Sequence, residues 1–144
     1  HGYSNKQHDG YLGHSYVGEW VNLGANTNNS DLKNNYSNIS INTGSEQIDA
    51  GMFAGCLIGD YSKTGISTMI NTGTYIGLGC NVFGGGFQDK HIPNFSWGKD
   101  GEKTDFKKFI KTLKIVKERR DQIITTAEFE LIKNIYNNSK SKKV

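Results

Sequence analysis

A six-residue period runs through the middle of the chain. Counting in steps of six gives apolar residues at every position but one; the stepped positions are Met52, Ile58, Thr64, Ile70, Ile76 and Val82. Four residues after each of the first five stands a small or β-branched residue, namely Cys56, Ser62, Thr68, Thr74 and Cys80. A period of six fits neither an α-helix nor the alternation of a half-exposed strand. It is typical of a solenoid of short parallel strands with a turn every six residues.

Glycine often follows the stepped residue, as in Ile58-Gly59 and Ile76-Gly77. The opening stretch follows the same rule, because Val17-Gly18 and Leu23-Gly24 are six residues apart. In such a solenoid we expect the large apolar residue to point inward, the small residue to fit near a corner, and glycine to permit the turn. Both cysteines then become small core residues rather than reactive thiols.

The period breaks over about residues 28–51, where an asparagine-rich run predicts a protruding loop insertion. Within it, Ile39 and Ile41 alternate with polar residues, which predicts a strand that rejoins the stack. A long loop on a regular scaffold commonly carries function, since it costs order without adding core.

Three consecutive glycines, Gly84-Gly85-Gly86, are expected to end the ladder, and an irregular connector that contains His91 should follow. Helical spacing of Phe106, Phe109, Ile110, Leu113, Val116 and Lys117 then predicts a helix over 105–120 with Thr104 as its N-cap. A second helix should begin where Thr125 and Glu128 can form a capping box.

These patterns predict a mainly β domain over residues 1–98 and a C-terminal helical extension over 99–144. Composition agrees with a thin-cored β architecture, because 18 glycines stand against one proline and 35% of the residues are hydrophobic. The formal net charge is +3, and Lys and Arg gather from Lys103 onward, as on a solvated helix face. No apolar run approaches the about 20 residues of a membrane span, so we expect a cytoplasmic protein without a membrane partner.

The most specific pattern lies near the start of the chain. It reads His8-x-x-Tyr11-Leu12-Gly13, followed by Gly18, Asn22, Gly24-Ala25 and Thr27. This pattern resembles the acetyltransferase domain of bifunctional sugar-1-phosphate nucleotidyltransferase/acetyltransferases, the family of the N-acetylglucosamine-1-phosphate uridyltransferase/glucosamine-1-phosphate N-acetyltransferase enzymes. The later segments LIGDYSKTGISTMINTGTYIG and IPNFSWG are similar to the archaeal and Bacteroidetes-type members.

The resemblance implies a left-handed parallel β-helix of hexapeptide repeats with an inserted loop and two C-terminal α-helices. It also implies a homotrimer, a role in UDP-N-acetylglucosamine biosynthesis, and an N-terminal nucleotidyltransferase domain that is missing from these residues. The implied activity is transfer of an acetyl group from acetyl-CoA, the cosubstrate, to the amine of a hexosamine 1-phosphate. No metal and no nucleic-acid partner are expected.

Within that family pattern, His8 takes the position of the catalytic base. An imidazole suits this role because it can accept the proton of a sugar amine at neutral pH. Tyr11 and Asn22 match positions that contact the sugar phosphate and the sugar, and Ala25 matches a position that lines the acetyl-CoA site. His14 falls outside the motif and is expected to be an exposed strand residue.

Two departures from the family keep a second hypothesis open. Asp31 stands in a loop that often carries an asparagine, and its charge would oppose a sugar phosphate. The family's basic residues for the phosphate lie mostly upstream of His8, and Lys6 is the candidate here for a partial substitute. The alternative is a non-catalytic β-helix that trimerises or regulates a sugar-1-phosphate nucleotidyltransferase. A hexapeptide carbonic anhydrase is rejected, because the histidines show no spacing for three zinc ligands.

Overall fold

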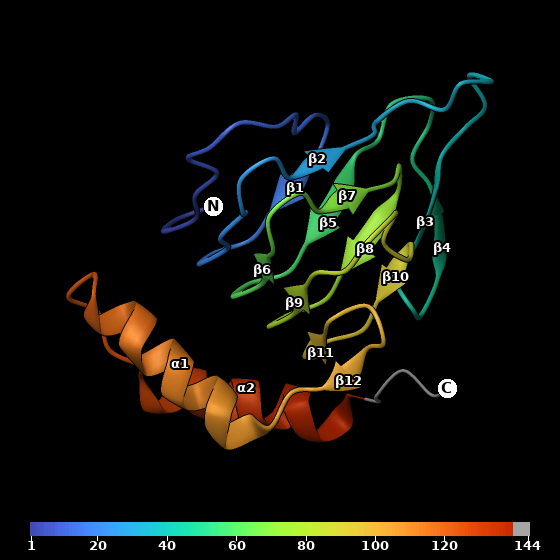
Figure 1. The fold of residues 1–144 in the computed structure, drawn as a ribbon. Helices are drawn as coiled ribbons and strands as arrows, with labels where there is room; N and C mark the ends of the chain where they lie inside the picture. The colour runs from blue at the N-terminus through green and yellow to red at the C-terminus, as the bar shows by residue number, and fades with distance from the viewer. Residues whose placement is uncertain (140–144) are drawn as a thin grey trace.

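A computed structural model describes residues 1–139, which form small, parallel-rich β-sheets and two C-terminal helices (Figure 1). The strands are β1 (Tyr16–Val17), β2 (Asn28–Asn29), β3 (Ser40–Asn42), β4 (Gln47–Asp49), β5 (Cys56–Ile58), β6 (Lys63–Thr64), β7 (Met69–Ile70), β8 (Thr74–Ile76), β9 (Asn81–Val82), β10 (His91–Ile92), β11 (Ser96–Trp97) and β12 (Glu102–Lys103). The helices are α1 (Phe106–Glu118) and α2 (Thr126–Asn138). The chain is therefore mainly β, as the sequence predicts.

Two of the parallel strand pairs have the same sequence distance. Cys56 of β5 pairs with Thr74 of β8, and Lys63 of β6 pairs with Asn81 of β9, so partners in these two ladders stand 18 residues apart. That distance equals three of the predicted six-residue steps. We call a stretch of the chain that makes three such steps a layer. One layer runs from β5 through β6 to β7, and β1 and β2 belong to the layer before it.

Side chains at both repeating positions fill the space inside the stack. Of the six stepped residues, all but Met52 are buried, and so are the five small residues that follow them. The principal core consists of Val21, Leu23, Cys56, Ile58, Ile70, Ile76, Cys80, Val82 and Ile92. Both cysteines are buried with free thiols, which confirms the prediction that they are core residues. Met52, the first of the stepped residues, is 42% exposed and does not share this burial.

The glycines have a role different from the predicted one. The φ of Gly59 lies outside the left-handed region, and a Cβ placed on it would come within 2.7 Å of the carbonyl carbon of Gly77 in the next layer. Glycine here allows two backbones to approach closely. The left-handed turn falls two residues later, at Trp20, Tyr61 and Gly79, where φ is 59°, 63° and 68°.

The predicted insertion contains a hairpin. The predicted strand forms as β3 and packs against the stack, but it pairs antiparallel with β4, with Ile41 opposite Ile48, instead of pairing with a strand of the stack. A tight turn causes the reversal, since the backbone N–H of Thr43 donates to the carbonyl of Glu46 and Gly44 adopts a φ of 92°. Ile39 and Ile41 are nevertheless buried, because the hairpin lies against one side of the stack (Figure 1).

The ladder continues beyond the glycine triplet, contrary to prediction. β10 pairs parallel with β8, and β11 pairs parallel with β9. The partners His91 and Tyr75 stand 16 residues apart, so this layer falls out of phase with the six-residue count. His91 is therefore a strand residue rather than part of an irregular connector, and its ring stacks on Tyr75 at 5.6 Å.

Both predicted helices form, and they cover one side of the stack (Figure 1). The N-cap of α1 is Asp105 instead of Thr104, because the Asp105 carboxylate accepts a hydrogen bond of 2.9 Å from the backbone N–H of Lys108. The capping box of Thr125 and Glu128 at α2 is confirmed. The predicted extension runs to residue 144, and 140–144 lie outside the described residues.

A second core joins the helices to the stack. Phe95, from the loop before β11, packs with Phe109 and Leu113 of α1 and with Ile132 of α2. Neither helix in residues 1–139 is long and apolar enough to cross a bilayer.

Candidate functional site

A cleft of about 820 Å³ opens between the N-terminal layer and the C-terminal end of α1. His8, Asn22 and Ala25, three of the four predicted site residues, line this cleft. The fourth, Tyr11, is not among its lining residues. We call this space the His8 cleft.

The wall of the His8 cleft is built by chain segments that run side by side. Asn5 lies in a parallel bridge with Asn22, and Asn22 lies in another with Lys63 of β6. The side-chain amide of Asn5 donates a hydrogen bond of 2.9 Å to the amide oxygen of Asn22. These three polar residues therefore form a column on three successive segments, which brings Lys63 beside the predicted site.

His8 itself is exposed at the cleft, and its imidazole has no hydrogen-bond or ion-pair partner within residues 1–139. Lys6 does not line the cleft. Its ammonium donates instead to the backbone carbonyls of His8 and Asp9, at 3.2 and 2.7 Å. Lys6 thus stabilises the loop that carries His8. Its ammonium does not lie in the cleft, where a role in phosphate binding would require it.

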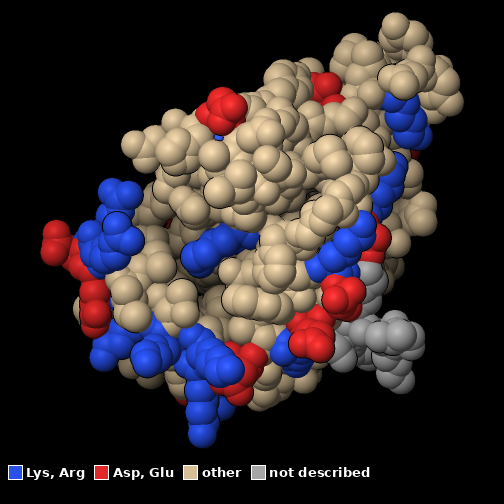
Figure 2. Space-filling view, in the orientation of Figure 1, with Lys and Arg blue, Asp and Glu red and all other residues tan. Residues whose placement is uncertain are grey.

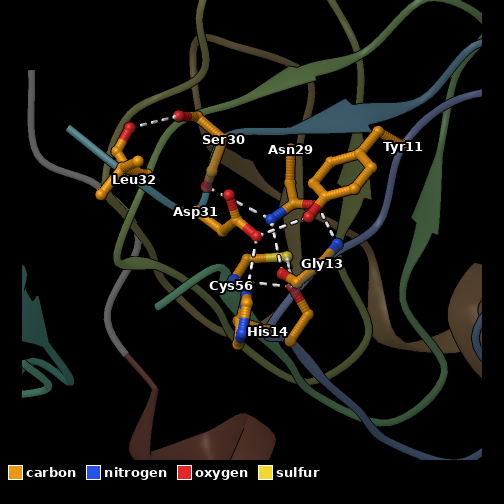
Figure 3. A network of polar contacts seen from close by, with 9 residues as sticks. Tyr11, Gly13, His14, Asn29, Ser30, Asp31, Leu32 and Cys56 are labelled. Carbon is orange, nitrogen blue, oxygen red and sulfur yellow. Dashed lines mark hydrogen bonds and ion pairs between the residues drawn. The ribbon is translucent and has the colours of Figure 1, made fainter. Parts of the chain in front are cut away.

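Tyr11 and His14 meet at Asp31 in a separate polar network (Figure 3). The Tyr11 hydroxyl donates to Oδ2 of Asp31 at 2.6 Å, and Nδ1 of His14 lies 2.7 Å from the same oxygen. The hydrogen bonds from Tyr11 and His14 hold the pKa of the Asp31 carboxyl below its ordinary value, and the bond to Asp31 raises the pKa of Tyr11. Two side chains therefore hydrogen-bond to the same oxygen of the Asp31 carboxylate.

The same network corrects the prediction for His14. It lies in a bend with a φ of 44° and not in a strand, although its side chain is 57% exposed as expected. The bend is held against β2 by a reciprocal pair of bonds between Gly13 and the side chain of Asn29, at 2.7 and 2.9 Å (Figure 3). These two bonds hold the loop in a conformation in which the side chains of Tyr11 and His14 both reach Asp31.

Sequence reasoning missed the basic residues of the His8 cleft. Lys63, Arg119 and Arg120 all line it, although the two arginines lie more than a hundred residues from His8 along the chain. Lys and Arg side chains gather over α1, and the surface between α1 and the stack is hollowed (Figure 2). The sequence does carry a signal for them, because two adjacent arginines directly follow a predicted amphipathic helix.

A second cleft, of about 610 Å³, lies along α1 between the helix and strands β9, β11 and β12. It shares Lys63 with the His8 cleft, and Trp97, Phe109 and Leu113 give it an apolar wall. Burial lowers the pKa of the Lys63 ammonium, which donates only to the carbonyl of Tyr61, at 3.2 Å, within the described residues. Lys63 thus stands where the two clefts meet.

No family model matches the chain. Over 73 residues, the chain is 32% identical to the bifunctional protein GlmU of Methanocaldococcus jannaschii. The match covers 51% of this chain but 18% of that protein, so the chain spans less than a fifth of the length of its relative. This partial match supports a relationship to GlmU-like proteins.

Proposed function

We propose that these residues form an acetyl-CoA-dependent N-acetyltransferase domain that acts on a hexosamine 1-phosphate, as part of a sugar nucleotidyltransferase-type protein. The observation that carries the proposal is the convergence of His8, Asn22 and Ala25 on one cleft. Further support comes from the partial match to GlmU. We also propose that the stack is a left-handed parallel β-helix, which the 18-residue pairing distance supports.

In this proposal His8 acts as the general base. Its imidazole accepts a proton from the sugar amine while the amine nitrogen attacks the thioester carbonyl of acetyl-CoA. The new C–N bond forms as the C–S bond breaks, and the thiolate of coenzyme A leaves and takes up a proton. Because the imidazole of His8 has no partner within residues 1–139, both ring nitrogens are available to the substrate.

The remaining polar groups would position the acceptor. Asn22 already accepts a hydrogen bond from Asn5, which leaves its own N–H₂ group to donate to a sugar hydroxyl. Ala25, with its small side chain, would leave room for the acetyl-CoA thioester. Tyr11 stays a prediction as a sugar-phosphate contact; its hydroxyl donates to Asp31 and keeps lone pairs with which to accept.

A thiol-release assay tests this proposal. Acetyl-CoA and glucosamine 1-phosphate are mixed with wild type, His8→Ala and His91→Ala, and free coenzyme A is measured. His91 is the matched control, because its ring stacks on Tyr75 and does not line the His8 cleft. We expect His8→Ala to lower kcat by about 10²- to 10⁴-fold, the usual contribution of a general base. His91→Ala should keep the wild-type rate.

One observation favours the alternative, a non-catalytic trimerisation or regulatory domain. His8 has no carboxylate to orient its ring within residues 1–139, whereas His14 has Asp31. If wild type releases no thiol above background, or if His8→Ala retains the full rate, the alternative replaces the catalytic proposal.

We also propose that the domain assembles as a homotrimer. Exposed large apolar side chains near Asp31 support an interface there: Tyr11 donates to Asp31, Phe53 lies 5.5 Å from the ring of His14, and the two residues are 54% and 52% exposed. Light scattering coupled to gel filtration should give three times the chain mass. A monomer would contradict this assembly without bearing on the role of His8.

A further inference from the structure

We propose that the C-terminal end of α1 forms a phosphate-binding wall of the His8 cleft, in which Arg119 and Arg120, together with Lys63 of β6, bind the phosphate of a sugar 1-phosphate. The identity of the sugar rests on the proposed function. The anion site itself rests on the charges and packing described below.

The charge of the cleft is one-sided. Among the described residues that line it, Lys63, Arg119 and Arg120 are cationic and none is an Asp or Glu. The neighbouring cleft along α1 differs, because its lysines are accompanied by Glu102 and Asp105. Uncompensated positive charge in a concave site attracts and concentrates anions. The His8 cleft, and not its neighbour, therefore has the charge of an anion site.

Both arginines are available to a ligand. Neither guanidinium forms an ion pair or hydrogen bond with another group in residues 1–139. Further back on α1, Lys114 pairs with Glu118 at 3.9 Å and Lys117 pairs with Glu128 at 2.6 Å. The guanidinium group binds phosphate through two parallel N–H···O bonds, so adjacent free arginines suit a phosphate group well.

The backbone that carries the arginines is held in place. Lys117, two residues before Arg119, is buried at 7% exposure and forms its ion pair with Glu128 of α2. The Lys117 ammonium also lies 5.2 Å from the ring centroid of Trp20, which lines the His8 cleft. This end of α1 is thereby attached to the cleft wall. Less conformational entropy of its backbone is then lost when a ligand binds.

The rest of the cleft fits a sugar attached to that phosphate. Tyr3 stacks on Trp20 with ring centroids 4.0 Å apart, and this pair forms an aromatic wall. Asn22 supplies a hydrogen-bonding amide on the same layer, and His8 supplies the imidazole. Apolar walls with a few placed polar groups are typical of small-molecule sites. Lys63, from the stack, is half-buried and adds a cation that an anion would help to stabilise, since burial disfavours its charged form.

Calorimetry of the purified protein tests the site without relying on turnover. Glucosamine 1-phosphate, glucosamine and acetyl-CoA are titrated into wild type, into the double variant Arg119→Gln/Arg120→Gln, and into the control Lys111→Gln/Lys114→Gln. The control removes the same charge from the helix that directly precedes the two arginines, and neither of its residues lines the His8 cleft. Circular dichroism and unfolding midpoints establish that both double variants are folded.

We expect wild type to bind glucosamine 1-phosphate at least about 10-fold more tightly than glucosamine, given the strength of charge-assisted hydrogen bonds. The arginine double variant should lose about 10- to 100-fold in affinity for the phosphate ester and little for glucosamine. The lysine control should change either affinity by less than about 2-fold, because exposed charges outside the site are screened.

Several outcomes would overturn the proposal. These are equal affinity of wild type for the sugar and its phosphate, an undiminished affinity in the arginine variant, and an equal loss in the lysine control. A loss of acetyl-CoA affinity alone would assign the arginines to the phosphates of coenzyme A and reject the sugar phosphate. If Arg-dependent binding of glucosamine 1-phosphate persists while no thiol is released, the acetyltransferase proposal fails and the phosphate site stands.

Discussion

Replacing Gly59 by alanine should destabilise the stack, although alanine is the smallest possible addition. The new Cβ would lie 2.7 Å from the carbonyl carbon of Gly77 and 2.7 Å from the amide nitrogen of Leu78. Non-bonded carbon atoms in proteins normally stay about 3.5 Å apart or more. Both obstructing atoms belong to backbone, which cannot rotate away as a side chain can. The two layers would therefore have to separate by several tenths of an ångström.

The expected cost follows from that separation. The N–H of Gly59 donates to the carbonyl of Ile76 at 2.7 Å, so moving the layers apart also stretches a hydrogen bond. Overpacking a close contact costs about 1–3 kcal/mol, and the rigid backbone places this site at the upper end. Alanine restricts the unfolded chain and returns about 0.5–1 kcal/mol. A net loss of about 2 kcal/mol should appear in urea unfolding, with a fall in Tm of about 4–8 °C.

Gly85→Ala is the matched control, because a Cβ there has nothing within 4 Å and the φ of Gly85 lies outside the left-handed region. We expect this variant to unfold within about 0.5 kcal/mol of wild type. Gly51→Ala measures the cost of a positive φ separately from the cost of a steric clash, since φ is 74° there and a Cβ again has nothing within 4 Å. If Gly59→Ala is as stable as Gly85→Ala, close approach of the layers is not the reason for this glycine.

Three further outcomes follow from charged and buried groups. Burial raises the pKa of the Glu128 carboxyl, but hydrogen bonds from Lys117 and Tyr61 outweigh it and hold that pKa below its usual range. Its stabilisation is therefore full above about pH 5 and is lost as the pH falls through the lowered pKa. Glu128→Gln should cost about 2 kcal/mol at pH 7, within the usual range for hydrogen bonds to a charged group, and clearly less at pH 3 in urea unfolding; equal costs would contradict this. The carboxyl carbon of Asp31, followed by NMR, should titrate with a midpoint below 3.8; a higher midpoint would mean that the bonds to Tyr11 and His14 do not form in solution. Burial raises the pKa of the Cys80 thiol to about 11, so a thiol reagent at pH 8 should label it about 100-fold more slowly in the folded protein than in urea.

The interior of the stack could be predicted because it repeats. Ile58, Ile70 and Ile76 recur at multiples of the six-residue step, and a regular spacing is visible in the sequence without knowledge of contacts. The hairpin of β3 and β4 could not be predicted in this way. Alternating isoleucines indicate a strand, but they do not tell whether its partner is the next layer or the following segment. The turn around Gly44 decides that choice.

The glycines show how a correct pattern can carry a wrong interpretation. Glycine at a regular position predicts either a left-handed turn or a close backbone approach, and both give the same sequence. The turn positions here hold residues as large as Trp20 and Tyr61, so the chain tolerates positive φ without glycine. Close approach at Gly59 tolerates no Cβ, which is why glycine occurs there.

In the candidate site, too, the residues that are close in sequence could be predicted, and those that are distant in sequence could not. His8, Asn22 and Ala25 lie within 18 residues of one another, so a short motif could place them together. The arginines reach the same cleft because α1 docks on the stack. One residue indicated this docking: Lys117 falls among the apolar positions of its helix, and a charge on the buried face requires a partner. That partner is Glu128 of α2, and the Lys117 ammonium also lies 5.2 Å from the ring centroid of Trp20, so Lys117 contacts the layer that carries the cleft. In this chain, therefore, a lysine in the apolar stripe of the helix marks the end of α1 that packs, and the two arginines that follow it line the cleft.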